Sequence, residues 1–339
     1  MDNSKYFFEY VNENHKNIAS IWITRSKNVL KLLRARNYKV YHNLSWRGIW
    51  YSVRAEVVIF CSSRSDIYFV FPKKNRKIVN LWHGMPMKKI VYDHTPHKPE
   101  NKNWKGLLWD KYVTGFQHKD VNLIPCTSEF FVNILKSAFR NENVVIAGQP
   151  RTDAFAKWDI HEIKQRLGFS KDDKIVIYMP THRAYGKGEM NPRIFEHNEK
   201  AQEYFEENNL KIVWKFHKNM LRHYTPNNEN LRSCFVDLTA KNLDPQELLF
   251  ISDILITDYS SCYIDYLLLK RPVIIYLYDN YETEDNELYY SPQDHNVGDV
   301  CYSEEELLQA IQNPRYYHSD IYHKYHDSNS CERILERLM

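Results

Sequence analysis

Asp253-Ile-Leu-Ile-Thr-Asp-Tyr-Ser-Ser-Cys-Tyr-Ile-Asp-Tyr-Leu-Leu-Leu-Lys-Arg-Pro272 is the segment that most clearly indicates the class of fold. Its apolar run at 254–256, with acidic residues on both sides, predicts a short buried strand. Residues 257–261 are types that cap helices, and the pattern from 262 to 269 predicts a helix that stops before Pro272. The stretch therefore predicts a strand, a polar turn and a helix in succession.

The polar turn has the chemistry of an anion site. Asp258, Ser260 and Ser261 lie where free backbone N–H groups and the positive end of a helix dipole would converge. The alternative is an ordinary strand–helix corner in which Asp258 and Ser260 only cap the helix. The rest of the chain decides between these two interpretations.

Length and composition indicate a soluble protein of two domains. The chain has 339 residues, of which 43% are hydrophobic and 26% charged, and its formal net charge of +3 favours no particular partner. One segment is strongly basic, because no acid occurs between Asp66 and Asp93. Such a segment suits phosphates, nucleic acid or an anionic membrane, unless it is merely a solvated edge. Its basic residues are Lys73, Lys74, Arg76, Lys77, Lys88 and Lys89.

The cysteines and the apolar runs predict a cytoplasmic protein. The six cysteines are scattered without a C-x-x-C pair, which is typical of reduced thiols. The N-terminal residues lack the pattern of a secretory signal, and no apolar run approaches the roughly 18 to 20 residues of a membrane span. Contact with a membrane surface stays open.

The first half of the chain predicts one α/β domain. A helix is expected from residue 5 to about 36, and strands then alternate with helical segments, which favours a parallel sheet covered by helices. The expected strands are 39–41, 56–61, 67–71, 77–81, 121–126 and 144–147, and the expected helices are 45–53 and 128–140, the latter capped at Thr127.

The second half predicts another α/β domain of similar size. We expect strands at 175–178, 211–216, 234–236, 254–256 and 273–276, and helices at 161–167, 194–207, 245–251, 262–269, 303–311 and 319–338. The predicted architecture is two Rossmann-like domains whose parallel sheets face an interdomain cleft, with ligands beyond the carboxyl ends of the strands. The expected boundaries are 1–155 for an acceptor-side domain, 156–318 for a nucleotide-donor domain, and 319–339 for a terminal helix that crosses back to the first domain.

Neither a cofactor nor a metal is expected. Only nine glycines occur, and the sequence contains no dinucleotide fingerprint, P-loop or G-x-S-x-G motif. The pair His94 and His97 has a metal-like spacing but lacks cysteine or carboxylate partners at fixed offsets.

A candidate general base follows the strand predicted at 77–81. Trp82-His83-Gly84-Met85-Pro86 cannot continue a strand, so His83 is expected on a turn where the backbone can approach a ligand closely. A histidine there suits proton transfer at neutral pH. The alternative is a histidine whose ring only bonds a nearby carbonyl.

Three further strand ends carry polar groups. Tyr178-Met-Pro-Thr-His-Arg183 presents Thr181 and Arg183 as phosphate ligands. Alternation in Trp214-Lys-Phe-His-Lys218 places Lys215 and His217 on one side, which could also be a solvated strand face. The turn Gly148-Gln-Pro-Arg151 adds another cation.

The segment Asn103-Trp-Lys-Gly-Leu-Leu-Trp-Asp-Lys-Tyr112 has the composition of an interfacial helix. Trp104 and Trp109 accompany leucines and lysines, so a membrane-contact segment is predicted near 97–119. The alternative is a helix that packs on its own domain.

These motifs, in this order, resemble the CDP-glycerol glycerophosphotransferase family, the teichoic acid primases and polymerases with a GT-B fold. The similarity spans about residues 38 to 335. It is carried by Asn80-Leu-Trp-His-Gly-Met-Pro-Met-Lys-Lys89, Gly148-Gln-Pro-Arg-Thr-Asp153, Tyr178-Met-Pro-Thr-His-Arg183, Ile256-Thr-Asp-Tyr-Ser-Ser261 with Asp265 and Arg271-Pro272, and Cys331-Glu-Arg333.

The resemblance implies a reaction and a set of roles. An acceptor hydroxyl would attack the glycerol-bearing phosphate of CDP-glycerol and release CMP, with fixed cations and a helix N-terminus stabilising the leaving group without a metal. His83 would take the proton of the acceptor hydroxyl, and His217 would be a second catalytic group beside the donor diphosphate. The implied donor-binding residues are Arg151, Thr181, Arg183, Lys215, Asp258, Ser260, Ser261 and Asp265.

The resemblance also implies a place and partners. The acceptor would be a lipid-linked saccharide or a polyol-phosphate polymer, in teichoic acid or capsule synthesis, at the cytoplasmic face of the cell membrane; nucleic acid is not expected. Met85 and His182 depart from the family pattern at positions that affect donor choice, so CDP-ribitol is an alternative donor. A nucleotide-sugar glycosyltransferase and a non-catalytic binder of phosphorylated lipid are the other hypotheses. The acceptor, the number of units added, primase or polymerase character and the oligomeric state are not predicted.

Overall fold

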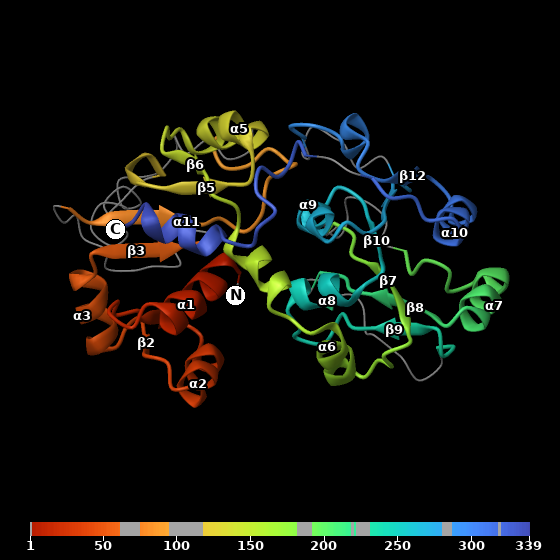
Figure 1. Ribbon diagram of the computed structural model, residues 1–339, viewed down its shortest axis with the longest axis horizontal. Coiled ribbons are helices and arrows are strands. Elements are labelled where there is room, and N and C mark those ends of the chain that lie inside the picture. The colour runs from red at the N-terminus through yellow and green to blue at the C-terminus, as the bar shows by residue number, and fades with distance from the viewer. Residues whose placement is uncertain are drawn as a thin grey trace. The chain divides into compact units, whose positions relative to one another are not determined.

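The computed structural model describes residues 2–61, 75–94, 118–181, 192–217, 220–221, 231–279, 287–317 and 320–339. The contacts divide the chain into two α/β units, Met1–Ala154 with Ile321–Met339 (unit 1) and Phe155–Asp320 (unit 2) (Figure 1). The predicted strand 67–71, Arg183, and residues 97–117 of the predicted membrane segment lie outside the described residues.

Unit 2 is built on one parallel sheet of six strands in the order β12-β11-β10-β7-β8-β9. The central strands are buried along almost their whole length, as parallel strands covered on both faces must be. Strands were correctly predicted at five of the six positions; β12 was not predicted. The strands are β7 (Lys174–Tyr178), β8 (Leu210–Trp214), β9 (Phe235–Asp237), β10 (Ile254–Thr257), β11 (Val273–Tyr276) and β12 (Asp299–Cys301).

The sheet of unit 2 reverses its winding direction beside β7. From β7 the chain proceeds through β8 to β9 at one edge, and it then returns so that β10 pairs with the other side of β7. This is the doubly wound order, and ligands of such sheets bind at the carboxyl ends of the strands where the direction reverses. In unit 2 that point lies between β7 and β10.

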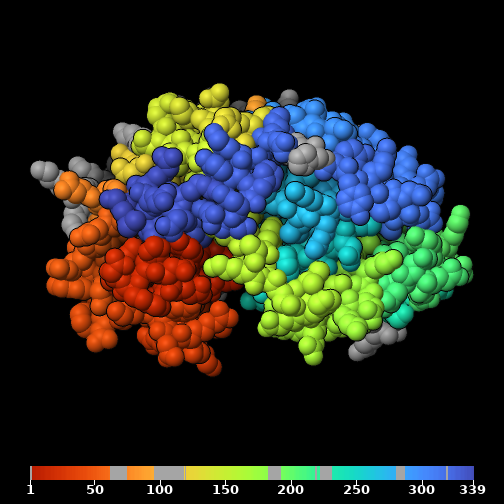
Figure 2. All heavy atoms as spheres, in the orientation of Figure 1, coloured from red at the N-terminus to blue at the C-terminus, as the bar shows by residue number. Residues whose placement is uncertain are grey.

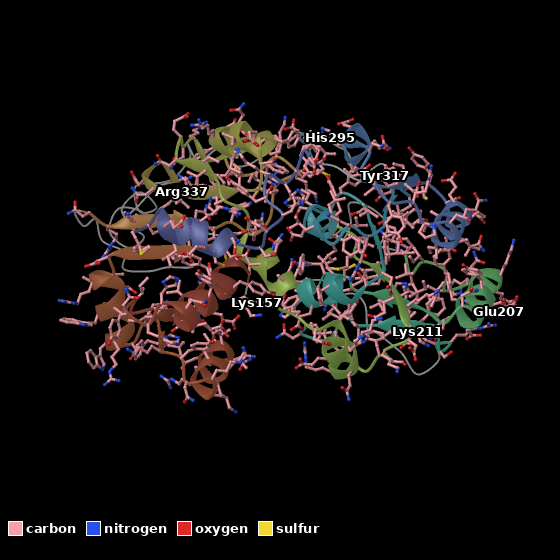
Figure 3. All side chains as sticks on the ribbon, viewed as in Figure 1. Lys157, Glu207, Lys211, His295, Tyr317 and Arg337 are labelled. Carbon is pink, nitrogen blue, oxygen red and sulfur yellow. The ribbon has the colours of Figure 1, made fainter. Side chains whose placement is uncertain are left out.

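Helices and aromatic side chains complete the core of unit 2. Trp214 is fully buried and stacks on Phe235 with ring centroids 4.8 Å apart, while Tyr178 meets Phe216 edge to face at 5.9 Å. Charged side chains such as that of Glu207, at the end of α7, project from the surface (Figure 3). The helices are α6 (Ile160–Leu167), α7 (Glu199–Glu207), α8 (Pro245–Ile251), α9 (Cys262–Tyr266) and α10 (Glu304–Gln312), with 3₁₀ turns η7 (Leu267–Leu269) and η9 (Pro292–His295).

The strands of unit 1 are also parallel. β3 pairs with β4 and β5 pairs with β6, and a bridge between Val79 and Leu123 joins the two pairs. Apolar side chains of α1 and α11, such as Phe7 and Ile334, pack together with Val79 in one core. The elements are α1 (Asn3–Asn14), β1 (Trp22–Thr24), α2 (Lys27–Ala35), β2 (Val40–His42), α3 (Trp46–Arg54), β3 (Val57–Phe60), β4 (Lys77–Asn80), η4 (His118–Asp120), β5 (Ile124–Cys126), α5 (Glu129–Phe139), β6 (Val144–Ile146), η5 (Pro150–Ala156) and α11 (Ser330–Glu336).

The long helix predicted from residue 5 to 36 is wrong. α1 ends at Asn14, and Trp22–Thr24 forms β1, which pairs in parallel with β2. The β-branched pair in Trp22-Ile23-Thr24 fits a strand better than a helix. The second half of the predicted helix is a separate helix, α2, capped by the side chain of Ser26.

The terminal helix is much shorter than predicted. Residues 319–338 were expected to be helical, but α11 covers only Ser330–Glu336. Before it the chain is fixed by tertiary contacts, with Tyr322 stacked on Phe131 and the Lys324 N–H bonded to the Thr127 carbonyl at 2.9 Å. The C-terminal residues, blue in Figure 2, lie directly against the red N-terminal residues, consistent with the contact between α1 and α11.

The carboxylate of Asp153 anchors the C-terminal helix to unit 1. It is buried and accepts hydrogen bonds from the N–H groups of Ser330 (3.0 Å) and Cys331 (2.7 Å). We expect Asp153→Ala to lower the free energy of unfolding of unit 1 by about 1–3 kcal/mol, because two buried donors lose their acceptor. Urea unfolding measures this loss.

The matched control for this prediction is Glu142→Ala. Glu142 is exposed and pairs with Lys136 in the same unit, so its removal should cost less than about 1 kcal/mol. Equal losses for Asp153→Ala and Glu142→Ala would contradict the anchoring role.

Candidate functional site

His83 lies on a sharply bent turn three residues after β4. Trp82 has φ 50° and Gly84 has φ 143°, so both neighbours of His83 lie in the left-handed region. Glycine adopts this region freely, whereas a tryptophan there requires support from its surroundings. The Trp82 N–H donates to Asn80 Oδ1 at 3.0 Å, and its ring packs edge to face on Phe139. The predicted turn is confirmed, and it is held from several sides.

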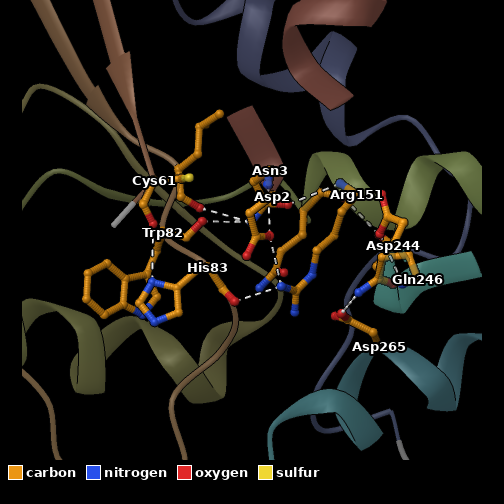
Figure 4. Close-up of polar contacts among 12 residues, drawn as sticks. Asp2, Asn3, Cys61, Trp82, His83, Arg151, Asp244, Gln246 and Asp265 are labelled. Atoms are coloured by element: carbon orange, nitrogen blue, oxygen red, sulfur yellow. Dashed lines mark hydrogen bonds and ion pairs between the residues drawn. The ribbon is translucent and has the colours of Figure 1, made fainter. Parts of the chain in front are cut away.

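The ring of His83 has a defined tautomer. Its Nδ1 lies 3.2 Å from the carbonyl oxygen of Cys61 (Figure 4). A carbonyl only accepts hydrogen bonds, so Nδ1 carries the hydrogen and Nε2 of the neutral ring holds the lone pair. The two sequence interpretations of His83 are therefore compatible, because the carbonyl bond orients a ring that can still accept a proton.

Arg151 lies beside His83 within unit 1. Its Nη1 donates to the main-chain carbonyl of His83 at 2.7 Å and to Asp2 Oδ1 at 3.0 Å (Figure 4). The backbone N–H of Arg151 donates to Asn3 Oδ1 at 3.1 Å. The sequence predicted that Arg151 binds the donor. Its observed contacts are instead with the carbonyl of His83 and with Asp2 and Asn3.

Thr181 and Asp258 meet at the point of unit 2 where the winding reverses. The Thr181 N–H donates to Asp258 Oδ1 at 2.7 Å, and Thr257 Oγ1 donates to the Met179 carbonyl at 2.7 Å. Asp258 is completely buried. These bonds join the loops that follow β7 and β10, so Asp258 connects two strands rather than capping its own helix.

The helix after this turn is shorter than predicted. α9 covers only Cys262–Tyr266, and Leu267–Leu269 is a 3₁₀ turn that ends at Lys270 with φ 54°. Ser261 is the N-cap residue, but its side chain makes no capping hydrogen bond. α9 is therefore shorter than the predicted helix, and a contribution of its N-terminus to anion binding stays a prediction.

Two side chains of α9, those of Cys262 and Asp265, make contacts within unit 2. Asp265 is buried and accepts a hydrogen bond from Gln246 Nε2 at 3.0 Å (Figure 4). Burial raises the pKa of the Cys262 thiol, which keeps it protonated and suits a structural position. Ser260 and Ser261 are half-buried.

Lys215 is engaged with the backbone beyond β9. Its ammonium donates to the carbonyls of Leu238 (3.0 Å), Thr239 (3.5 Å) and Lys241 (2.8 Å). Burial lowers the pKa of Lys215, while Asp237 opposes that shift. The predicted neighbour His217 is exposed and lies after the end of β8.

The structure groups the predicted residues in two places. Thr181, Asp258, Lys215 and His217 follow adjacent strands of unit 2, whereas His83 and Arg151 adjoin one another in unit 1. The sequence interpretation missed Asp2 and Asn3, whose only local signal was a cap for α1. The N-cap residue of α5 is Ser128, one residue after the predicted cap Thr127, and its side chain makes no capping hydrogen bond.

No metal cluster is evident in the described part of the chain. Across residues 2–61, 75–94, 118–181, 192–217, 220–221, 231–279, 287–317 and 320–339, no group of three or more His, Cys, Asp or Glu side chains is placed to hold an ion. His97, the partner of His94 in the metal-like spacing, lies outside these ranges.

Comparison with known proteins identifies the family. All 339 residues match the family described as CDP-glycerol:poly(glycerophosphate) glycerophosphotransferase. The chain belongs to this family. The predicted family and enzyme class, a transferase of glycerol phosphate from CDP-glycerol, are therefore confirmed.

Similar proteins act on more than one polyol phosphate. A teichoic acid poly(glycerol phosphate) polymerase of Bacillus spizizenii is 29% identical over 94% of this chain and 81% of its own length. A teichoic acid glycerol-phosphate transferase of Staphylococcus aureus is 25% identical over 92% of this chain and 80% of its own length. A ribitol-phosphate polymerase of Staphylococcus aureus is 27% identical, but this chain covers only 54% of it.

Solved structures confirm the predicted α/β fold of GT-B type. The wall teichoic acid polymerase TagF has a TM-score of 0.77 at 20% identity, covering 100% of this chain and 85% of TagF. A complex of Staphylococcus aureus MnaA with UDP has a TM-score of 0.53 at 16% identity, covering 99% of this chain and 92% of MnaA. At these identities the likeness concerns the fold alone.

The contacts of Lys215 predict a role in stability. We expect Lys215→Met to lower the free energy of unfolding by about 1–3 kcal/mol, because three carbonyls lose their donor. Lys211→Met is the matched control, since Lys211 (labelled in Figure 3) donates to one carbonyl among the described residues, that of Ser233. Guanidinium unfolding of both variants measures the difference, and equal losses would contradict the prediction.

The parent and the Lys215→Met variant should differ in how their free energies of unfolding depend on pH. The folded pKa of Lys215 is lowered from 10.5, so the unfolded chain holds this proton to higher pH than the folded chain does. The stability that results is present above pH 10.5 and is lost as pH falls through the lowered pKa. The parent should therefore gain stability relative to Lys215→Met as pH rises through that window.

Proposed function

We propose that this chain transfers glycerol phosphate from CDP-glycerol to a hydroxyl of a lipid-linked or polymeric acceptor in teichoic acid synthesis. The family supports the donor and the reaction. The observation that carries the assignment to residues is the tautomer of His83, because the Cys61 carbonyl orients an imidazole whose Nε2 can accept a proton. The acceptor and the membrane-associated setting belong to the proposal.

In the proposed reaction His83 acts as general base. Nε2 takes the proton of the acceptor hydroxyl, and the acceptor oxygen forms a bond to the phosphorus that carries glycerol. The bond from that phosphorus to the bridging oxygen of CDP breaks, and CMP leaves with the electron pair. The hydroxyl needs this assistance because it is a weak nucleophile when protonated.

We assign the donor side to the carboxyl edge of the unit 2 sheet. Thr181, Ser260 and Ser261 follow β7 and β10, the strands between which winding reverses, and sheets of this order bind their ligands there. Arg183 and His217 would add positive charge toward the diphosphate. The buried Asp258 would hold the loop of Thr181 in place through its 2.7 Å bond.

Two alternatives for the donor come from particular observations. CDP-ribitol stays open because the relatives include a ribitol-phosphate polymerase. A nucleotide sugar is less favoured, since the family that the chain matches is described by CDP-glycerol. The expectation that no metal is needed is part of the same proposal.

A donor panel tests the reaction and the base together. With a lipid-linked acceptor, CMP release should be fastest with CDP-glycerol and slower with CDP-ribitol. With nucleotide sugars, no release of nucleoside diphosphate should be detected. His83→Ala should lower kcat by about 10²–10⁴-fold, the contribution typical of a general base, while CDP-glycerol still binds. A dialysed sample with chelator should keep its activity.

Three outcomes would count against this assignment. Full turnover by His83→Ala would contradict the assignment of His83 as general base. Sugar transfer without CMP release would contradict the assignment of CDP-glycerol as donor. Loss of activity with chelator, restored by a divalent cation, would contradict the metal-free expectation.

We further propose that unit 1 contacts an anionic membrane surface. No helix within the described ranges combines the length and apolar character of a bilayer span. On α3, however, Trp46 is 71% exposed and Trp50, one turn later, is 53% exposed. The guanidinium groups of Arg47 and Arg54 lie over these rings at 5.3 and 5.0 Å. Tryptophan beside arginine is the composition that suits the headgroup region of a bilayer.

The charge around α3 favours the same partner. No acidic residue occurs between Glu13 and Glu56, a segment that contains all of α2 and α3. Both helices contact β2, so their basic side chains belong to one part of unit 1. Such a surface is attracted to anionic lipid at roughly 1 kcal/mol for each basic residue near it.

Vesicle flotation tests the membrane surface. The parent should float with phosphatidylglycerol vesicles and not with phosphatidylcholine vesicles, and Trp46→Glu/Trp50→Glu should lose most of this binding. Tyr302→Glu/Tyr316→Glu is the control, because these exposed aromatic residues lie in unit 2. Equal flotation of the Trp46→Glu/Trp50→Glu variant and the parent would exclude this surface and direct attention to Trp104 and Trp109.

A further inference from the structure

The carbonyl of His83 is held by a partly buried ion pair. Arg151 Nη1 lies 2.7 Å from this carbonyl oxygen and 3.0 Å from Asp2 Oδ1, and only 8% of the Arg151 side chain is exposed. A buried guanidinium needs a carboxylate partner, and Asp2 supplies it. The charge of Arg151 is thereby neutralised by the N-cap residue of α1, directly beside the candidate base.

Asn3 holds the residues immediately before His83. Its Nδ2 donates to the carbonyls of Leu81 (3.2 Å) and Trp82 (2.9 Å), and its Oδ1 accepts from the Arg151 N–H at 3.1 Å. Asn3 is completely buried. Three consecutive carbonyls, those of Leu81, Trp82 and His83, are thus bound by the side chains of Asn3 and Arg151 (Figure 4).

This arrangement addresses a specific problem of the turn. Trp82 has φ 50°, a conformation that a residue with a large side chain rarely adopts and that persists only when neighbouring contacts enforce it. The direction of the His83 ring depends on the backbone conformation at Trp82, because that conformation orients the following residue and therefore its side chain. Without Asn3 and Arg151 the turn could relax and take Nε2 away from its working position.

We propose that Asp2, Asn3 and Arg151 are positioning residues for His83, and that Arg151 acts on the base rather than on the donor. The proposal rests on the proposed role of His83 as general base. It makes the start of the chain part of the machinery of transfer, although Asp2 lies 149 residues from Arg151 in the sequence. A displacement of about 1 Å at a reacting group is enough to cost roughly 10²-fold in rate.

Steady-state kinetics of Arg151→Gln test the proposal. We expect kcat for CMP release to fall by about 10–100-fold while KM for CDP-glycerol stays within about 3-fold, as for a loss of orientation without loss of donor binding. Arg151→Lys, which keeps the charge, should recover part of the rate. A tenfold rise in KM with unchanged kcat would instead identify Arg151 as a donor ligand and overturn the proposal.

A matched control separates positioning from general loss of structure. Arg76 is as buried as Arg151 and also donates to main-chain carbonyls in unit 1, those of Ala55 and Val53, at the opposite end of β4. Arg76→Gln should keep kcat within about 3-fold when rates are divided by the folded fraction from thermal melts. An equal fall in Arg76→Gln and Arg151→Gln would overturn the positioning role.

A double-mutant cycle shows whether Arg151 acts through His83. If it does, Arg151→Gln should cost less than about 2-fold in a His83→Ala background, because the group it positions is already absent. The full cost in both backgrounds would overturn the proposal while leaving His83 as base. Unimpaired His83→Ala would instead remove the base, and the positioning role with it. Should Arg151→Gln not fold, Asp2→Asn, at a partly exposed position, is measured by the same cycle.

Discussion

The pairing of β10 with β7 is the contact on which the organisation of unit 2 depends. β7 also pairs with β8, so later strands are added on both sides of β7. The loops after β7 and β10 therefore run in different directions from the carboxyl ends of these strands. Backbone groups at such a point are not covered by the next helix, so a ligand can reach them. The bonds from Thr181 to Asp258 and from Thr257 to Met179 then hold the two loops together.

In unit 1, side-chain hydrogen bonds to backbone carbonyls hold the turn that carries His83. This candidate base lies on a strained turn after β4, and the strain is resisted by residues from both ends of the unit, Asn3 near the start and Arg151 after β6. The candidate base His83 is exposed, while Asn3 and Arg151, which bind the carbonyls of its turn, are buried. This division is physically reasonable, since buried side chains that make several hydrogen bonds have little freedom to move.

Much of the fold was predictable because apolar runs of four or five residues followed by turn residues are typical of buried parallel strands. The exceptions have physical causes. The segment 15–26 was assigned to a helix, yet Trp22–Thr24 pairs with β2, and pairing between distant segments leaves no periodic signal. The segment before α11 was also assigned to a helix, but the stacking of Tyr322 on Phe131 and the capping by Asp153 hold it in an irregular path.

The order of residues along the chain was enough to predict which residues follow the strands, and with them the family, the reaction and the position of His83 on a turn. Local order was sufficient there, because a strand, a glycine and a proline constrain their neighbours directly. The contacts of those residues became known from the packing of the folded chain. Lys215 binds three carbonyls, Asp258 joins two strands, and Arg151 supports His83 together with Asp2. Hydrogen bonds between groups tens or hundreds of residues apart depend on how the chain packs, and a single sequence contains no local record of that packing.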